Sequence, residues 1–130
     1  MRFVACGVIR ADHHREIPPR LLEIHQGLCE VIAQHRPERA AVEDIFTAVN
    51  PRSALKLGHA RGVAILAAMQ HGLPVAEYTP RVVKQAVAGY GQASKEQVQQ
   101  MVRALLNLAA TPSQDAADAL AVAICGANHL

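Results

Sequence analysis

Two aspartates near the C-terminal end of the chain are the first candidates for chemistry. Asp115 and Asp118 lie within residues 113–124, a run otherwise made mostly of Ala, Leu, Val and Ile. Pro112 ahead of this run and Ser113 at its start indicate the beginning of a buried helix. A spacing of three places both carboxylates on one side of that helix, where they repel each other. A shared cation would remove the repulsion, and Mg²⁺ suits such a site because it takes oxygen ligands.

A simpler explanation is that acids in a first helical turn complement the helix dipole, which is worth up to about 1 kcal/mol. A metal site therefore needs another ligand, and Glu43 is the candidate. It follows the apolar residues 40–42, and ligands gather at the carboxyl ends of strands in open α/β sheets. A solvent-facing acid at a strand end is the alternative. Together, the three carboxylates suggest a site for one or two divalent cations that act on a phosphodiester.

The composition fits one α/β domain that spans residues 1–130. Hydrophobic residues make up 51% of the chain, but aromatic residues make up only 3% and Trp is absent. The core must therefore be closely packed Ala, Val, Leu and Ile, as in helices that lie on a sheet. A net charge of +2 permits a nucleic-acid partner without requiring one.

The cysteines and the N-terminal segment indicate a cytoplasmic protein. Cys6, Cys29 and Cys125 are odd in number and form no C-x-x-C motif. This pattern favours free buried thiols in a reducing compartment over a zinc or redox site. Residues 1–7 are too short an apolar run for a signal peptide. No stretch approaches the roughly 18 apolar residues of a membrane span, so we expect no membrane partner.

Hydrophobic periodicity, prolines and capping residues predict the element order β-α-β-α-β-α-α-α. This order describes a mixed α/β domain with helices against a sheet. Ser53 is the expected cap of the second helix, and Ser94 opens a capping box. The expected strands are 3–9, 40–42 and 75–78, and the expected helices follow Pro19 to His35 and span 53–68, 80–87, 94–106 and 113–124.

Several short motifs occur in one order along residues 3–124. They are Ala-Val-Glu-Asp-Ile-Phe at 41–46, Ser-Ala-Leu-Lys-Leu-Gly-His-Ala-Arg-Gly at 53–62, Val-Lys-Gln at 83–85, Lys-Glu-Gln-Val-Gln at 95–99 and Asp-Ala-Ala-Asp-Ala-Leu-Ala at 115–121. Together they closely resemble the RuvC family of Holliday junction resolvases. The resemblance implies a ribonuclease-H-like mixed sheet with flanking helices. It also implies a homodimeric endonuclease of DNA recombination and repair that nicks four-way junctions symmetrically with Mg²⁺, and a branch-migration motor complex as partner.

The resemblance assigns roles to the acids. Glu43, Asp115 and Asp118 match three of the family's four catalytic acidic positions, which bind one or two Mg²⁺ ions. The fourth is an Asp in a Gly-Ile-Asp-Pro-Gly strand, the central one of the family's sheet, and a second strand follows it. Neither strand is in this sequence, and Asp12 and Glu16 do not replace that Asp. We therefore expect an N-terminally truncated form, from a start codon placed too far downstream, with little or no cleavage by this polypeptide.

Three further residues match DNA-facing positions of the family. Phe46 stands where the family stacks an aromatic ring on junction bases, although core packing is the alternative for this residue. Lys84 and Lys95 match lysines near the scissile phosphate, and solvated surface lysines are the alternative for them. A further group shares one helical face and could meet either DNA phosphates or a dimer partner. Its members are Arg52, Lys56 and His59.

Three functions compete for this sequence. The first is the structure-selective endonuclease. The second is a junction-binding or dimerising module with impaired catalysis, because the first catalytic Asp is absent. The third is a generic ribonuclease-H-like nuclease that cleaves RNA–DNA hybrids, and the family-specific helix at residues 53–62 argues against it.

Overall fold

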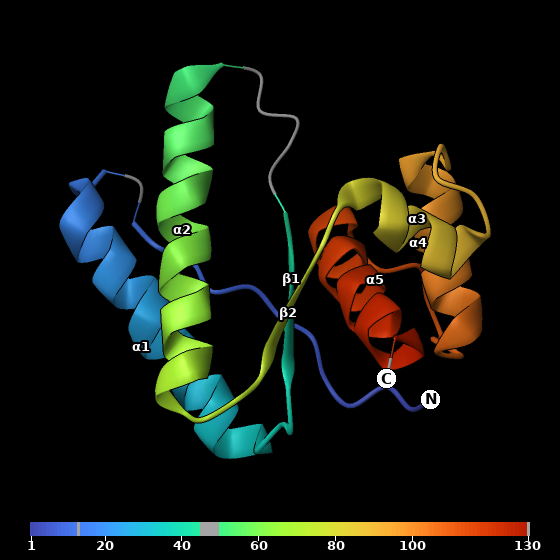
Figure 1. Ribbon diagram of the computed structural model, residues 1–130, viewed down its shortest axis with the longest axis horizontal. Helices are drawn as coiled ribbons and strands as arrows, with labels where there is room; N and C mark the ends of the chain where they lie inside the picture. The colour runs from blue at the N-terminus through green and yellow to red at the C-terminus, as the bar shows by residue number, and fades with distance from the viewer. Residues whose placement is uncertain (13, 45–49, 130) are drawn as a thin grey trace. The chain divides into compact units, whose positions relative to one another are not determined.

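Two helices that lie side by side, α1 and α2, dominate the first half of the chain (Figure 1). In the order of the chain, the elements alternate between helix and strand as far as β2 and are helical from there on. The computed structural model describes residues 1–12, 14–44 and 50–129. The elements are α1 (Ile17–His35), β1 (Ala40–Glu43), α2 (Pro51–Gln70), β2 (Val75–Tyr78), α3 (Pro80–Ala88), α4 (Lys95–Leu105) and α5 (Gln114–Asn128).

The chain folds as two compact units. Residues Ile9–Ala76 form one unit, which contains α1, β1 and α2 and which we call the helix-pair unit. Residues Met1–Val8 and Glu77–Leu130 form the other, which contains α3, α4 and α5 and which we call the three-helix unit. The organisation of residues 1–130 as one ribonuclease-H-like domain stays a prediction.

Helix α1 begins and ends where its sequence dictates. Pro18 and Pro19 stand in the first turn, where the missing N–H of proline leaves no helical bond unmade. At the other end, Arg36 adopts a left-handed conformation with φ 48°, and its N–H donates to the Ile32 carbonyl at 2.8 Å. Pro37 follows and cannot continue the helix. Because the two prolines fit the first turn, the helix begins before them, further toward the N-terminus than the periodicity alone predicted.

Helix α2 is capped by Asn50, and the prediction that Ser53 is the cap was wrong. The Asn50 side-chain oxygen accepts a hydrogen bond from the Ser53 N–H at 2.9 Å. Asn50 has extended backbone angles, as a capping residue requires, whereas Ser53 lies inside the helix. Pro51 directly after the cap fits the first helical position. Asparagine and serine are both good caps, so residue type alone did not decide between them.

Replacing Asn50 with Ala is expected to lower the free energy of unfolding by about 1 kcal/mol, because the Ser53 N–H loses its acceptor. Ser53→Ala is the matched control and should change stability by only a few tenths of a kcal/mol, since Ala is the better helix former. Urea denaturation followed by circular dichroism measures both variants. The reverse order of effects would show that Ser53 is the cap.

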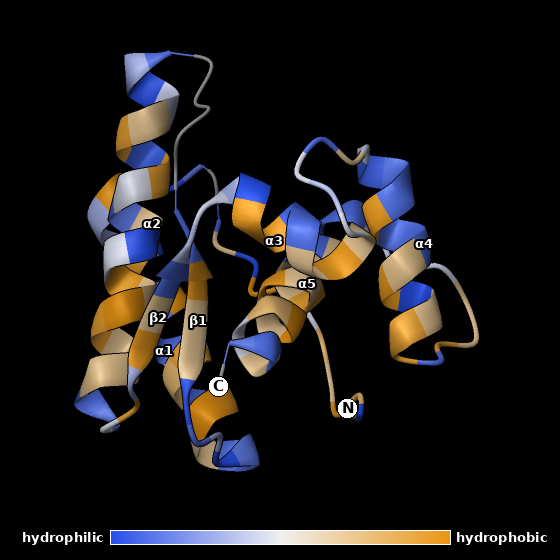
Figure 2. Ribbon diagram, turned by 45° about the vertical axis from the view of Figure 1, so that its right-hand side comes forward, coloured by the Kyte–Doolittle hydropathy of each residue, from blue (hydrophilic) through white to orange (hydrophobic). Residues whose placement is uncertain are grey.

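The described residues form one short sheet of two neighbouring strands, β1 and β2. The Ala40 N–H donates to the Pro74 carbonyl at 2.9 Å just before β2 begins. The strands run in the same direction, with α2 between them in sequence (Figure 2). The strands predicted at 40–42 and 75–78 are thereby confirmed. Helices with a short parallel sheet agree with the predicted mixed α/β class.

The strand predicted at residues 3–9 is not formed. A strand needs a neighbouring backbone to take up its N–H and C=O groups, and the sheet of the described residues consists of β1 and β2. Phe3, Val4 and Val8 in this segment are exposed, so its β-prone composition is not matched by burial.

Helix α5 packs against both α3 and α4 in the three-helix unit. It is the most uniformly apolar of the three (Figure 2). The Ser94 side chain and Gln97 form the predicted capping box at the start of α4. Small and branched aliphatic residues fill the core of this unit, as the composition predicted. The buried side chains include Val83, Val87, Val98, Val102, Ala117, Leu120, Ala121, Val122, Ile124 and Cys125.

All three cysteines are free thiols, as predicted, but Cys125 alone is fully buried. Cys29 is half-buried and Cys6 is exposed, because Cys6 lies in the N-terminal segment that forms no strand. Among the described residues, no helix combines the length and the apolar character that a membrane crossing requires.

Candidate metal and nucleic-acid site

Asp115 and Asp118 lie in the first two turns of α5, with exposed side chains. The Ser113 hydroxyl accepts a hydrogen bond from the Ala116 N–H at 3.3 Å, which fixes the start of the helix. Ala117 and Leu120 are buried on the other side. The two acids therefore stand at the surface on a helix that is anchored in the core, as the sequence predicted.

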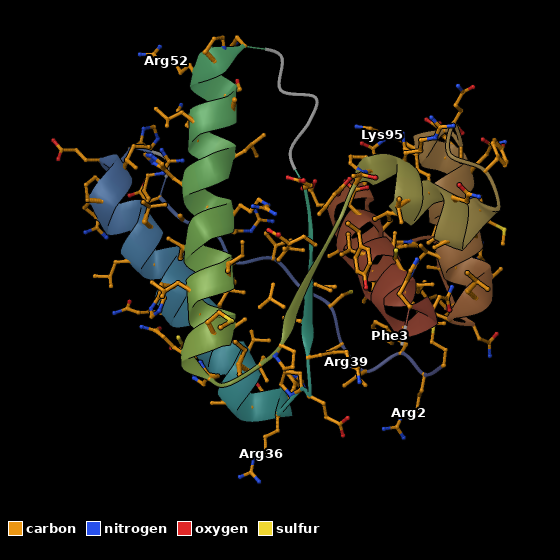
Figure 3. All side chains as sticks on the ribbon, in the orientation of Figure 1. Arg2, Phe3, Arg36, Arg39, Arg52 and Lys95 are labelled. Carbon is orange, nitrogen blue, oxygen red and sulfur yellow. The ribbon has the colours of Figure 1, made fainter. Side chains whose placement is uncertain are left out.

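Asp118 experiences opposing electrostatic influences from its own unit. Desolvation is the largest, and it raises the pKa of Asp118 above its ordinary value even though part of the side chain faces solvent. The Lys95 ammonium lowers this pKa, the Asp115 carboxylate raises it, and Lys84 lowers it with the smallest effect. The other three side chains therefore lie within electrostatic range of Asp118. Lys84 comes from α3, Lys95 from the first residue of α4 (Figure 3), and both acids from α5.

This arrangement can bind both a cation and an anion. Two carboxylates with a separation of three residues supply the hard oxygen ligands that Mg²⁺ takes. Two lysines beside them supply positive charge for a phosphate group. A phosphodiester held by the lysines would thus lie next to the acids.

Replacing Lys95 with Met is expected to raise the pKa of Asp118 further, because the strongest influence that lowers it is removed. Lys84→Met should raise this pKa less, and Asp115→Asn should lower it. Carboxyl-carbon NMR titration of Asp118 without metal measures all three. A cation binds the ionised carboxylate, so its affinity should rise with pH through this pKa, and Lys95→Met should move that rise to higher pH. A lower pKa of Asp118 in Lys95→Met would contradict the proximity of the two groups.

Side chains that sequence reasoning missed hold the loop before α5 in place. The Gln99 side-chain amide donates to the Pro112 carbonyl at 3.1 Å. Arg103 contacts the Leu108 and Ala109 carbonyls at 3.5 and 3.3 Å. Gln99 follows Lys95 by four residues and so lies on the same face of α4. No local pattern signals its bond to Pro112, 13 residues away, and this bond links the start of α5 to the helix that carries Lys95.

Glu43 is the last residue of β1 in the helix-pair unit, at the strand end where the sequence placed it. Its side chain is half-buried. The Arg61 Nε atom of α2 donates to the Glu43 backbone carbonyl at 3.3 Å. The same guanidinium lies 3.7 Å from a carboxylate oxygen of Asp44.

The predicted residues thus fall into three groups. Asp115, Asp118, Lys84 and Lys95 come together in the three-helix unit. Glu43 belongs to the helix-pair unit. Phe46 lies outside the described residues. Within neither unit, over residues 1–12, 14–44 and 50–129, do three or more His, Cys, Asp or Glu side chains gather closely enough to hold a metal ion.

Arg52, Lys56 and His59 are exposed on α2, and Arg52 lies at its N-terminal end (Figure 3). Their placement is compatible with both predicted uses, contact with DNA phosphates or with a dimer partner.

Solved structures define the class of protein. The chain is similar to the structure of Thermus thermophilus RuvC, with a TM-score of 0.86 and 39% identity over 97% of this chain and 76% of that chain. It is also similar to T. thermophilus RuvC in complex with Holliday junction substrate, with a TM-score of 0.92 and 39% identity over 98% of this chain and 78% of that one. The fold is ribonuclease-H-like, as the motifs implied.

The sequence comparisons give the family. Residues 1–126 match the family described as crossover junction endodeoxyribonuclease RuvC. A RuvC from Geobacter metallireducens is 61% identical over 94% of this chain and 74% of its own length. A RuvC from Halorhodospira halophila is 53% identical over 98% of this chain and 77% of its own length. The chain belongs to the RuvC family of Holliday junction resolvases, which are metal-dependent endonucleases.

Proposed function

We propose that this protein is a Mg²⁺-dependent, structure-selective endonuclease that resolves four-way DNA junctions by paired symmetric nicks. The observation that carries the proposal is the grouping of Asp115, Lys84 and Lys95, from three helices of one unit, around Asp118. Glu43, Asp115 and Asp118 are the proposed ligands of one or two ions. When bound at these residues, Mg²⁺ would supply an activated water and stabilise the charge of the leaving oxygen.

The side chains of the protein bind and position the DNA in this mechanism. Lys84 and Lys95 bind the oxygens of the scissile phosphate, and their charge also favours the ionised form of Asp118. Ionised Asp118 and Asp115 provide the oxygens that metal binding needs. Phe46 stacks on a base at the junction, a contact worth about 1–3 kcal/mol.

Four-way junction DNA is the proposed substrate. A T. thermophilus relative is known in complex with Holliday junction substrate, and it aligns with 98% of this chain. The proposed setting is DNA recombination and repair in the cytoplasm. A branch-migration motor complex is the proposed partner there, by resemblance to the family.

A homodimer would supply two such sites for symmetric nicking, and α2 offers a surface for it. Leu55, Leu66 and Met69 are exposed on one face of the helix. Gly58 and Gly62 lie between them at helical spacing, and a Cβ at either glycine would meet no described heavy atom within 4 Å apart from its chain neighbours and the backbone of its own helix. Glycine destabilises a helix by up to about 1 kcal/mol relative to Ala. Two such glycines beside exposed leucines fit the close approach of a partner helix.

Leu66→Lys is expected to convert the dimer into a monomer, because a charged group would be buried in the apolar contact. Leu22→Lys on α1 is the matched control, since Leu22 is similarly exposed on another helix. Sedimentation velocity measures the mass of each variant. A dimer of undiminished stability in Leu66→Lys would exclude this face of α2 as the interface.

Nicking of a synthetic four-way junction tests the proposed function. The assay uses the full-length protein, meaning the complete polypeptide that the gene encodes. We expect two symmetric nicks that require Mg²⁺, stop with EDTA and are lost in Asp115→Asn. Glu30→Gln is the control, because Glu30 is an exposed acid on α1. Junction binding without nicking would instead support the non-cleaving binding module. Cleavage of RNA–DNA hybrids in place of junctions would support the generic nuclease.

A further inference from the structure

Arg61 contacts two consecutive residues at the point where the chain leaves β1. Its Nε donates to the Glu43 carbonyl at 3.3 Å, and its Nη2 lies 3.7 Å from the Asp44 Oδ1. The Arg61 side chain is 23% exposed and that of Asp44 39% exposed. The guanidinium therefore engages the backbone of the first residue and the carboxylate of the second.

This pair of contacts limits how the end of β1 can move. The planar guanidinium presents its donors in fixed directions, so the hydrogen bond to the Glu43 carbonyl and the ion pair with Asp44 together restrict the backbone at this point. Arg61 itself projects from α2, a helix of 20 residues that packs on α1 and contacts β1. Strand β1 has only four residues. Arg61 thus links the end of a short strand to a much longer helix.

We propose that Arg61 is a positioning residue for the Glu43 carboxylate. The inference rests on the proposed function, in which Glu43 is a metal ligand. The side chain of a ligand can hold its direction only if its own backbone is fixed, and Arg61 binds that backbone at the Glu43 carbonyl. Groups that orient metal ligands typically contribute about 10- to 100-fold in metal affinity or activity.

Simple electrostatics predicts the opposite change in Mg²⁺ affinity when Arg61 is removed. A cation close to a metal ligand repels the metal, so removing it should tighten Mg²⁺ binding if charge alone mattered. Under the positioning role, removal of Arg61 weakens Mg²⁺ binding because the Glu43 carboxylate loses its fixed direction. The direction of the change therefore separates the two effects. A direct contact of Arg61 with DNA is a third possibility, and it would lower junction affinity in the absence of metal.

The test uses the full-length protein and measures single-turnover nicking as a function of Mg²⁺ concentration. In Arg61→Ala we expect the Mg²⁺ concentration for half-maximal rate to rise about 10-fold or more, and the maximal rate to fall about 10- to 100-fold. Junction affinity in EDTA should stay unchanged. Arg61→Lys should recover part of the loss, because one ammonium can satisfy one of the two acceptors. Arg39→Ala is the matched control, an exposed arginine just before β1 that should nick like the wild type.

Asp44→Asn keeps the test decisive if Arg61→Ala fails to fold. It weakens the ion pair and leaves the Nε bond to Glu43, so a rise of a few-fold in the Mg²⁺ requirement is expected. Unchanged or tighter Mg²⁺ dependence in the Arg61 variants, or a loss of junction affinity in EDTA, would overturn the positioning role. Glu43→Gln distinguishes failure of the proposed metal site from failure of the positioning role of Arg61. If it nicks normally, the proposed metal site fails, whereas a dead Glu43→Gln with an unaffected Arg61→Ala refutes only the role of Arg61.

Discussion

Asp118→Asn is expected to lower the rate of junction nicking by about 100-fold or more. The amide cannot replace an ionised carboxylate as a metal ligand, and displacement of reacting groups by about 1 Å already reduces rates on the order of 100-fold. The variant should fold normally. Desolvation disfavours the ionised form of Asp118 in the folded protein, and a neutral amide avoids that penalty. The measurement is single-turnover nicking at saturating Mg²⁺, with thermal unfolding alongside.

Glu30→Gln controls for the loss of one negative charge, since Glu30 is exposed on α1. Junction affinity in EDTA should be unchanged or slightly higher in Asp118→Asn, because less negative charge faces the phosphates. Nicking at the wild-type rate would remove Asp118 from the list of metal ligands. Loss of junction binding would point to a structural role instead.

Glu43→Gln is expected to have an effect of similar size, about 100-fold or more in nicking rate, for the same reason. Asp44 offers a matched comparison, because it is the adjacent acid and its carboxylate lies 3.7 Å from Arg61. Asp44→Asn should therefore retain most of the nicking rate at saturating Mg²⁺. Both variants are measured against the wild type over a range of Mg²⁺ concentrations.

The contrast between neighbouring acids makes this comparison specific. Equal losses in the two variants would mean that general damage to the end of β1, not removal of a ligand, lowers the rate. Full activity in Glu43→Gln would leave the site to the acids of α5 alone.

Local signals in the sequence predicted the parts of the fold that local chemistry controls. Ser94 and Gln97 form the capping box, and Ser113 caps the helix that carries Asp115 and Asp118, because side chain and backbone partners lie three residues apart. Strand β1 was predicted from its apolar run, and it ends at Glu43 as expected. The grouping of Lys84 and Lys95 with the acids followed from resemblance, since no local pattern brings three helices together.

The predictions were wrong or incomplete where the local structure depends on backbone conformation or on contacts with other parts of the chain. Residues 3–9 have the composition of a strand, but strand formation depends on a neighbouring backbone that composition does not reveal. Asn50 took the capping position because its backbone is extended there, and residue type alone left Ser53 an equal candidate. The contacts of Arg61 at the end of β1 and of Gln99 before α5 join residues 18 and 13 positions apart, beyond the reach of helical periodicity.

The most direct test of the proposed metal site is Mn²⁺ titration of the ¹⁵N-labelled full-length protein, followed by paramagnetic broadening of the amide signals. If Glu43, Asp115 and Asp118 bind the same ions, the amide signals of these residues broaden together at the lowest Mn²⁺ concentrations, and excess Mg²⁺ reverses the effect. Broadening at residues 115–118 with an unaffected Glu43 signal, or broadening at other acids first, would contradict a shared site.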